Sequence, residues 1–140
     1  MFKDFYIFIK LNHPQAKMPD KAYAGDAGFD LYACEQVVLE KDKRALIPTG
    51  IQTEFSKGFV ALIRDRSSTP KTHICVAGVI DSGYRGEWFV QVIGRKKHVI
   101  KPGDKIAQFL IMPIFDGNLI QVDYLNENTE RGRKKLGSSG

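Results

Sequence analysis

The chain has 140 residues, of which 43% are hydrophobic and 26% are charged, and its formal net charge is +5. This size and composition indicate one globular domain that is large enough for a real core. No apolar run approaches the length of a membrane-spanning helix, and the first residues lack the layout of a signal peptide, so we expect no membrane partner.

Strand-like runs recur along the chain, with turn signals between them. They cover residues 5–11, 29–33, 36–39, 44–48, 51–54, 59–64, 88–93, 98–100, 105–113 and 120–124. Their spacing predicts a β-sandwich or a β-barrel. Residues 69–74 are expected to hold a single short helix, and the polar, basic segment from Asn126 onward is expected to be a mobile arm.

The positive charge is concentrated in two short segments, residues 95–98 and the last ten residues. The second segment contains Arg131, Arg133, Lys134 and Lys135. Local clusters of this kind suit a polyphosphate or a solvated loop as well as they suit a nucleic-acid groove.

The two cysteines, Cys34 and Cys75, lie far apart, with no CxxC pattern and no nearby histidine pair. A metal site built on sulfur is therefore not expected. A disulfide between them is one alternative, and two buried thiols in a reducing cytoplasm is the interpretation that we prefer.

Residues 78–87 place an acid and an aromatic residue on either side of a Ser-Gly turn that follows an apolar run. This layout predicts a β-hairpin whose tip presents one carboxylate, one ring and bare backbone amides to a ligand. Asp81 would orient or deprotonate a water, and Tyr84 would stack on a sugar. The alternative is an acidic turn residue followed by a core tyrosine.

A second polar segment, residues 64–71, contains Arg66, Ser67 and Ser68 just before the expected helix. A guanidinium, two hydroxyls and the backbone amides of a helix start make a cradle for an anion. The alternative is a capped helix N-terminus on a solvated surface.

Two further segments place a polar residue among apolar neighbours. Asp30 begins a strand after the bend that Gly25 and Gly28 permit, where it either caps a turn or holds a water of hydrated Mg²⁺. Gln108 interrupts an apolar strand after a Pro-Gly turn and, if buried, must find partners. Asp104 in that turn is expected to pin an arginine such as Arg66, and an ordinary turn with an exposed glutamine is the alternative.

The last ten residues combine glycines, hydroxyls and cations. A mobile tail of this composition suits a lid that folds over phosphates. A basic disordered tail, or a vector-derived Gly-Ser-Ser-Gly end, is the alternative.

Taken together, the five segments resemble the ordered motifs of the homotrimeric all-β dUTPase family. The matching stretches are residues 27–31, 66–71, 78–86, 103–108 and 131–140. The resemblance extends from about residue 17 to the end, and it implies a jelly-roll-like β-barrel with at most one short helix over residues 1–125. It also implies a C-terminal arm at residues 126–140 that closes over an active site, and a homotrimer whose subunits share three sites.

The same resemblance implies a dUTP diphosphatase, which hydrolyses dUTP to dUMP and pyrophosphate with Mg²⁺ by attack of water on the α-phosphorus. This reaction keeps uracil out of DNA and supplies dUMP for thymidylate synthesis. The implied location is the cytoplasm, or the host-cell cytoplasm for a viral protein, and nucleic acid is not an expected partner.

The resemblance also assigns roles to residues. Asp81 positions and activates the attacking water, and Ser67 and Gln108 complete the catalytic set. The substrate-binding residues are Arg66, Ser67, Ser68, Gly78, Val79, Ile80, Asp81, Tyr84, Arg131, Leu136, Gly137 and Ser138. Asp104 gives structural support, and Asp30 reaches the water shell of a Mg²⁺ ion that the phosphates mainly hold.

The chain departs from the family pattern at two informative positions. Leu136 stands where an aromatic residue usually stacks on uracil, and leucine covers a base without a π-face. Asp65 stands where proline usually precedes Arg66, and its charge lowers the local positive potential.

Two other functions compete with this interpretation. A dCTP deaminase shares the barrel and the phosphate motif, but it needs a glutamate near the pyrimidine amine, where this chain has Asp81 and an apolar Val79-Ile80. A binding module on the same fold would use the basic tail to contact a protein or a nucleic acid, with negligible nucleotide hydrolysis.

Overall fold

The computed structural model describes residues 5–135 and residue 137, and this part of the chain is built almost entirely from short strands. One 3₁₀ turn, η1 (Thr69–Lys71), interrupts them. The strands are β1 (Ile7–Leu11), β2 (Phe29–Tyr32), β3 (Val37–Leu39), β4 (Arg44–Pro48), β5 (Ile51–Phe55), β6 (Phe59–Arg64), β7 (His73–Cys75), β8 (Val79–Asp81), β9 (Phe89–Gly94), β10 (His98–Ile100) and β11 (Lys105–Pro113).

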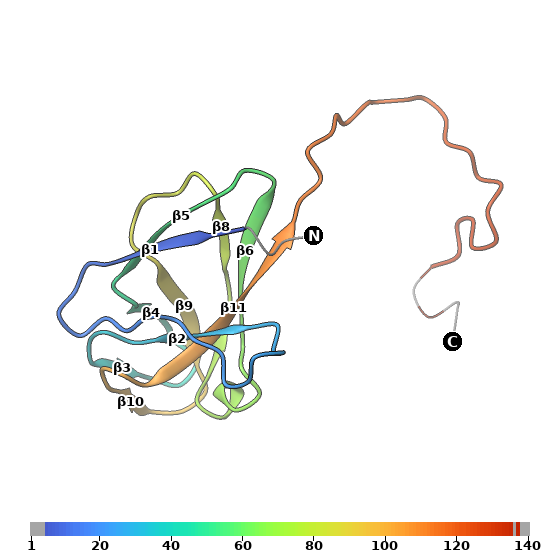
Figure 1. Ribbon diagram of the computed structural model, residues 1–140. Coiled ribbons are helices and arrows are strands. Elements are labelled where there is room, and N and C mark those ends of the chain that lie inside the picture. The colour runs from blue at the N-terminus through green and yellow to red at the C-terminus, as the bar shows by residue number, and fades with distance from the viewer. Residues whose placement is uncertain (1–4, 136, 138–140) are drawn as a thin grey trace.

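The strands form small antiparallel sheets in a jelly-roll-like arrangement rather than one closed hydrogen-bonded barrel. A four-stranded sheet has the order β2-β11-β6-β8, and a three-stranded sheet has the order β4-β9-β7. β1 pairs with β5, and β3 pairs with β10. Figure 1 shows β11 crossing the body of the molecule and leaving it at one end, where the C-terminal segment begins.

The predicted all-β fold class is confirmed, but three local expectations are wrong. The expected helix is shorter, because β7 takes up the second half of its range. Residues 120–124 form no strand, since they are exposed and lie beside no other strand that would complete a ladder. The strands on either side of the Ser-Gly turn do not pair as a hairpin, because β8 pairs with β6 whereas β9 pairs with β4 and β7.

Trp88 lies between β8, in the four-stranded sheet, and β9, in the three-stranded sheet. Its side chain is fully buried, its ring packs edge-on against Phe109 at a centroid distance of 5.0 Å, and its indole Nε1 donates to Thr53 Oγ1 at 3.1 Å. Its backbone carbonyl accepts the Thr49 hydroxyl at 2.6 Å. Since a buried polar group must be paired, this network fixes the start of β9 beside β5.

A bulge in β11 decides which residues face outward. Gln108 lies opposite Asp30 of β2 and Arg64 of β6, so these three share the outer face of the sheet. The register then shifts between Lys105 and Ala107, which places Lys105 opposite Tyr32. Because facing residues alternate along a strand, the extra residue returns Lys105 to the face of Asp30 instead of the core.

We predict that Thr53→Val destabilises the fold by about 1–3 kcal/mol, because the Trp88 indole N–H would lose its acceptor in a buried position. Chemical denaturation monitored by tryptophan fluorescence measures this change. Val38→Thr, on the exposed face of β3, is the matched control and should stay within about 0.5 kcal/mol. Equal stabilities for both variants would contradict the proposed importance of the network.

Candidate active site

A cavity of about 380 Å³ lies over the outer face of the four-stranded sheet. We call the group formed by Asp30, Arg66, Ser67 and Gln108, which line this cavity, the cationic cradle. Arg66 Nε donates to Asp30 Oδ1 at 2.8 Å, and Lys105 Nζ lies 3.4 Å from Asp30 Oδ2. The two cations balance Asp30 and Asp26, the two carboxylates that line the cavity, and the N–H groups that Arg66 still has free can donate to an anion.

Asp30 rather than Asp104 orients Arg66, which corrects the expected pairing. The Asp30 side chain is only 10% exposed, and its two oxygens meet the two cations. The Asp104 carboxylate instead accepts the backbone N–H of Lys101 at 2.8 Å, while its carbonyl accepts the N–H of Ala33 at 2.9 Å. Asp104 therefore supports the turn that leads into β11.

The Gln108 side chain, which lies between apolar neighbours in β11, is hydrogen-bonded. Its Nε2 donates to the carbonyl of Asp65 at 2.9 Å, so the β11 side chain holds the backbone just before Arg66. Its Oε1 lies so close to Gly28 that an added Cβ would approach it to 2.0 Å. Glycine is required there because the glutamine side chain occupies the space of any larger residue.

Ser67 and Ser68 are exposed between Arg66 and η1. Ser68 Oγ accepts a hydrogen bond from Arg66 Nη1 at 3.3 Å and does not cap η1. The side-chain cap that the alternative interpretation invoked is therefore not made by Ser68. The Ser68 hydroxyl and the guanidinium lie together instead, an arrangement that suits an anion.

Two residues that were not predicted from the sequence support the segment that follows Ser68. The buried His73 ring joins β7 to β11, because Nε2 lies 2.8 Å from the carbonyl of Ile106, and a carbonyl can only accept. Arg95 Nη1 donates to the carbonyl of Pro70 at 3.1 Å. A lone histidine in a strand and a basic turn residue carry no recognisable sequence signal for such a role.

A second cavity, of about 310 Å³, lies beside β8, and we call it the β8 pocket. Its lining residues are Leu46, Val79, Ile80, Asp81, Tyr84, Glu87, Phe89 and Gln91. The sequence reasoning missed Leu46, Phe89 and Gln91, because their outward positions on β4 and β9 look like those of any half-exposed strand. The expected carboxylate and ring, Asp81 and Tyr84, are both exposed here.

Close backbone contacts place the functional groups of this pocket. Tyr84 Oη donates to the carbonyl of Glu87 at 2.9 Å, and the ring folds against Gly86, where an added Cβ would lie 2.4 Å from Oη. At the other end, the carbonyl of Gly78 accepts the N–H of Ile63 at 2.7 Å, and a Cβ on Gly78 would lie 2.6 Å from Ile63 Cβ. Glycine at both positions lets the chain approach closely.

Arg85 and Gln52 fix the turn that carries Tyr84. Arg85 Nη1 donates to the carbonyl of Ser82 at 2.7 Å and to that of Thr53 at 3.4 Å. Gln52 Nε2 donates to the carbonyl of Arg85 at 2.7 Å. The turn is therefore tied to β5, although it lies at the surface.

The cationic cradle and the β8 pocket lie far apart in one chain. Asp81 is level with Val60, whereas Arg64 is level with Gln108, so the two sites are four residues apart along β6, about 13 Å. Asp30 is also three strands away from Asp81, about 14 Å across the sheet. The Asp81 and Asp30 carboxylates of one chain therefore cannot contact the same atom of a ligand.

The C-terminal arm does not cover either cavity of its own chain. Figure 1 shows the segment after β11 running away from the body, and its described residues are exposed. Arg131 Nε donates to the carbonyl of Lys134 at 3.2 Å, which is a contact within the arm. Gly137 is also described, whereas Leu136 and Ser138 lie outside the described residues.

The described residues contain no group of three or more His, Cys, Asp or Glu side chains that would hold a metal ion. Asp30 and Asp26 are the carboxylates that line the cavity of the cationic cradle. Mg²⁺ is commonly bound through one or two carboxylates together with the phosphates of a substrate, so this donor set fits an ion that arrives with a polyphosphate. The described part of the chain also has no helix with the length and apolar character of a membrane span.

Both cysteines are free thiols. Burial, followed by the nearby charges of Glu87 and Glu35, raises the pKa of Cys34 to about 11. Burial, followed by a hydrogen bond to Asp65 and the charge of that carboxylate, raises the pKa of Cys75 to about 12. Both thiols therefore stay protonated at neutral pH, and neither has the character of a nucleophile.

Comparison with known proteins confirms the family. Residues 14–140 match the dUTPase family model. The chain is 38% identical over 143 aligned positions to the deoxyuridine 5'-triphosphate nucleotidohydrolase of Clostridium tetani, with 98% of each chain covered. It is 39% identical over 142 positions to that of Alkaliphilus metalliredigens, with 97% of this chain and 98% of the relative covered.

Solved structures agree with these relatives. A mutant dUTPase of Staphylococcus bacteriophage 80alpha with dUpNHpp superposes with a TM-score of 0.86 at 29% identity and covers 96% of this chain and 98% of its own. A mutant dUTPase from phage phi11 of S. aureus, described with a structural Mg(II) ion, has a TM-score of 0.79 at 26% identity and covers 85% and 97%. The enzyme class that the five motifs implied, dUTP diphosphatase, is supported by all four proteins, and the chain belongs to the dUTPase family.

Proposed function

We propose that this protein hydrolyses dUTP to dUMP and pyrophosphate by attack of water on the α-phosphorus, with Mg²⁺ as cofactor. The observation that carries the proposal is the pairing of two kinds of site on one family scaffold. The cationic cradle suits phosphates, and the β8 pocket suits a nucleoside beside a carboxylate. In a cell, this reaction would keep uracil out of DNA and supply dUMP for thymidylate synthesis.

The cationic cradle would bind the phosphates. Arg66 donates in a fixed direction because Asp30 holds its Nε, which leaves Nη2 and the second N–H of Nη1 for phosphate oxygens. Ser67 and Ser68 would add hydroxyl donors, with Ser67 nearest the bond that breaks. Gln108 would help to place water or phosphate while it holds the loop.

The β8 pocket would bind the nucleoside. β8 is the edge strand of its sheet, so the backbone of Gly78, Val79 and Ile80 has a side turned away from β6. Peptide groups on a strand edge donate and accept at fixed positions, as the edge of uracil requires. Tyr84, held by the carbonyl of Glu87, would pack under the deoxyribose and disfavour a 2′-hydroxyl.

Asp81 would act as the base. Its carboxylate is exposed at the end of β8, on the rim of the β8 pocket. It would take a proton from water as the water oxygen bonds to the α-phosphorus and the bridging bond to the β-phosphate breaks, so that pyrophosphate leaves. Pre-set donors around the phosphates would supply most of the barrier reduction.

Bound Mg²⁺ would supply positive charge that neutralises and orients the three phosphates. Asp30 is the residue that we propose to reach the water shell of the ion, beside its ion pairs with Arg66 and Lys105. The ion is therefore expected to arrive with the nucleotide.

In a homotrimer, the cationic cradle of one subunit could lie beside the β8 pocket of another. Asp81 must lie within hydrogen-bond reach of a water that contacts the α-phosphorus, and one chain keeps it far from Arg66. We therefore propose that each site combines the β8 pocket of one subunit with the cationic cradle of another. The nucleotide would bridge the two.

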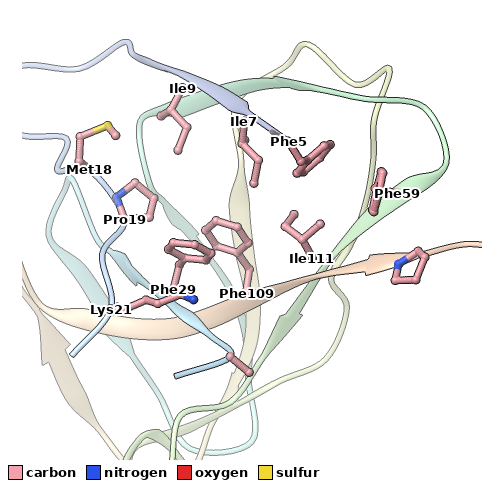
Figure 2. Close-up of a pocket in the computed structure, with 12 residues that line it drawn as sticks. Phe5, Ile7, Ile9, Met18, Pro19, Lys21, Phe29, Phe59, Phe109 and Ile111 are labelled. Carbon is pink, nitrogen blue, oxygen red and sulfur yellow. The ribbon is translucent and has the colours of Figure 1, made fainter. Parts of the chain in front are cut away.

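An apolar groove that the described residues leave open also supports assembly. A cavity of about 500 Å³ lies between β1, β6 and β11. Figure 2 shows the aromatic and aliphatic side chains that line it, which include Phe5, Phe29 and Ile111. The segment between β11 and the arm, residues 114–125, carries exposed apolar residues, with Leu119 94% exposed and Tyr124 91% exposed. Apolar patches of this kind mark interaction sites, and we propose that another copy of the chain covers them.

The last residues would complete the site as a lid, which continues the proposed division between a domain at residues 1–125 and an arm at residues 126–140. Arg131 would grip the γ-phosphate, and Leu136, Gly137 and Ser138 would close over the base and phosphates. Cytoplasmic localisation and the absence of a nucleic-acid partner stay predictions.

The test is pyrophosphate release with Mg²⁺ from dUTP, with dCTP, dTTP and UTP in parallel. We expect rapid release from dUTP alone, and chelation of Mg²⁺ by EDTA should abolish it. Ammonia release from dCTP would instead identify a deaminase, and Glu87 in the β8 pocket would then be the first residue to substitute. No release from any nucleotide, together with salt-sensitive binding to DNA, would favour the binding module.

We predict that Asp81→Asn lowers kcat for dUTP by about 10²–10⁴-fold, because the amide cannot accept the proton of water. Binding of a non-hydrolysable dUTP analogue, measured by calorimetry, should change little, since shape and size are kept. Asp42→Asn, in a turn outside both cavities, is the matched control and should retain full activity. Retained turnover in Asp81→Asn would refute the role of the base.

We predict that two truncations separate the lid from the assembly. Removal of residues 131–140 should lower turnover strongly and leave the trimer intact, because the exposed apolar residues of the segment 114–125 remain. Removal of residues 115–140 should leave a monomer, because the apolar segment that we propose to contact another copy is then lost. Light scattering after size exclusion measures both masses. Normal kinetics in the first variant, or a trimer in the second, would contradict the corresponding assignment.

A further inference from the structure

Asp65 occupies the junction between β6 and the loop that carries the cationic cradle. It is the residue at which the chain departs from the proline of the family pattern. A carboxylate beside a phosphate-binding arginine lowers the local positive potential, so by charge alone it opposes polyphosphate binding. The hydrogen bonds of Asp65 offset this cost, because they fix the loop that carries Arg66.

The Asp65 side chain is a hydrogen-bond acceptor for the element that follows the loop. Its Oδ1 accepts the backbone N–H of Cys75 in β7 at 2.9 Å, and Thr69 Oγ1 in η1 lies 3.4 Å away. The Asp65 carboxylate is also one of the causes that raise the pKa of the Cys75 thiol, after burial. The carboxylate is half-buried and is satisfied by neutral donors, so its geometry is fixed by the backbone of β7.

A residue of β11 also fixes the backbone of Asp65. Its carbonyl accepts Gln108 Nε2 of β11 at 2.9 Å. One residue therefore links the end of β6, the start of η1, β7 and β11, immediately before Arg66. A loop held at its first residue in this way loses little further freedom when it binds phosphate.

We propose that Asp65 is a positioning residue, which fixes the Arg66–Ser67–Ser68 loop through side-chain hydrogen bonds where the family pattern uses the rigidity of proline. Proline fixes one backbone angle and restricts the residue before it. Asp65 reaches a comparable result by anchoring its side chain to the N–H of Cys75. The inference rests on the proposed function, because it assumes that this loop binds the phosphates of dUTP.

Three substitutions at this residue separate its hydrogen bonds from its charge. Asp65→Asn keeps an oxygen acceptor for the Cys75 N–H and removes the charge. Asp65→Ala removes both. Asp65→Pro also removes both but stiffens the backbone, and residue 64 already has the extended conformation that precedes a proline.

Steady-state kinetics with dUTP, with thermal melting and light scattering on the same samples, give the readout. We expect Asp65→Asn to keep kcat within about twofold, with KM unchanged or lowered because the positive potential rises. Asp65→Ala should lose about tenfold or more in kcat while it remains a folded oligomer. Asp65→Pro should recover most of that loss.

The outcomes distinguish this inference from the proposed function. An inactive wild-type protein would refute the proposed function itself. An active wild type with Asp65→Ala at the same kcat and KM would overturn the positioning role of Asp65 alone. Equal loss in Asp65→Asn and Asp65→Ala would also overturn it, because the charge and not the acceptor would then matter. Should Asp65→Ala fail to fold, the kcat values of Asp65→Asn and Asp65→Pro still decide, since both must stay active.

Discussion

The nearly buried ion pair between Asp30 and Arg66 is the interaction on which the cationic cradle depends. A carboxylate in that position must be paired, because an isolated buried charge is costly. Arg66 at 2.8 Å and Lys105 at 3.4 Å meet this need, and their remaining N–H groups can donate to an anion. Lys105 reaches Asp30 because the bulge in β11 changes its face. The ion pair that neutralises Asp30 therefore also orients the guanidinium of Arg66.

Close backbone packing holds the remaining functional groups. Gly28 makes room for Gln108, and Gly86 makes room for the ring of Tyr84. Arg85 ties the turn after β8 to β5 through backbone carbonyls. The polar side chains are thus placed by sheets that lie beneath loops, which is how a surface site can be rigid without a deep cleft.

The geometry of one chain places the acid of the β8 pocket and the arginine of the cationic cradle at opposite ends of a sheet. The described residues also leave the apolar groove open and the apolar segment 114–125 exposed, and both are unfavourable in water for an isolated subunit. A chain that holds its candidate catalytic groups apart, and whose described residues leave an apolar groove and an apolar segment exposed, is consistent with function in an assembly.

The sequence by itself determined the all-β class, nearly every strand, the family and most of the polar residues that line the two cavities, because strand periodicity and short motifs are local properties. The tertiary structure alone decided which residues meet. Residues 120–124 have the pattern of a strand but no neighbouring strand among the described residues. The residues around Ser82 have the pattern of a hairpin, but β9, which follows the buried Trp88, pairs in another sheet. Asp30 rather than Asp104 pairs with Arg66, and Leu46 and Phe89 enter the β8 pocket, because strand register and sheet packing join positions that are distant in the chain.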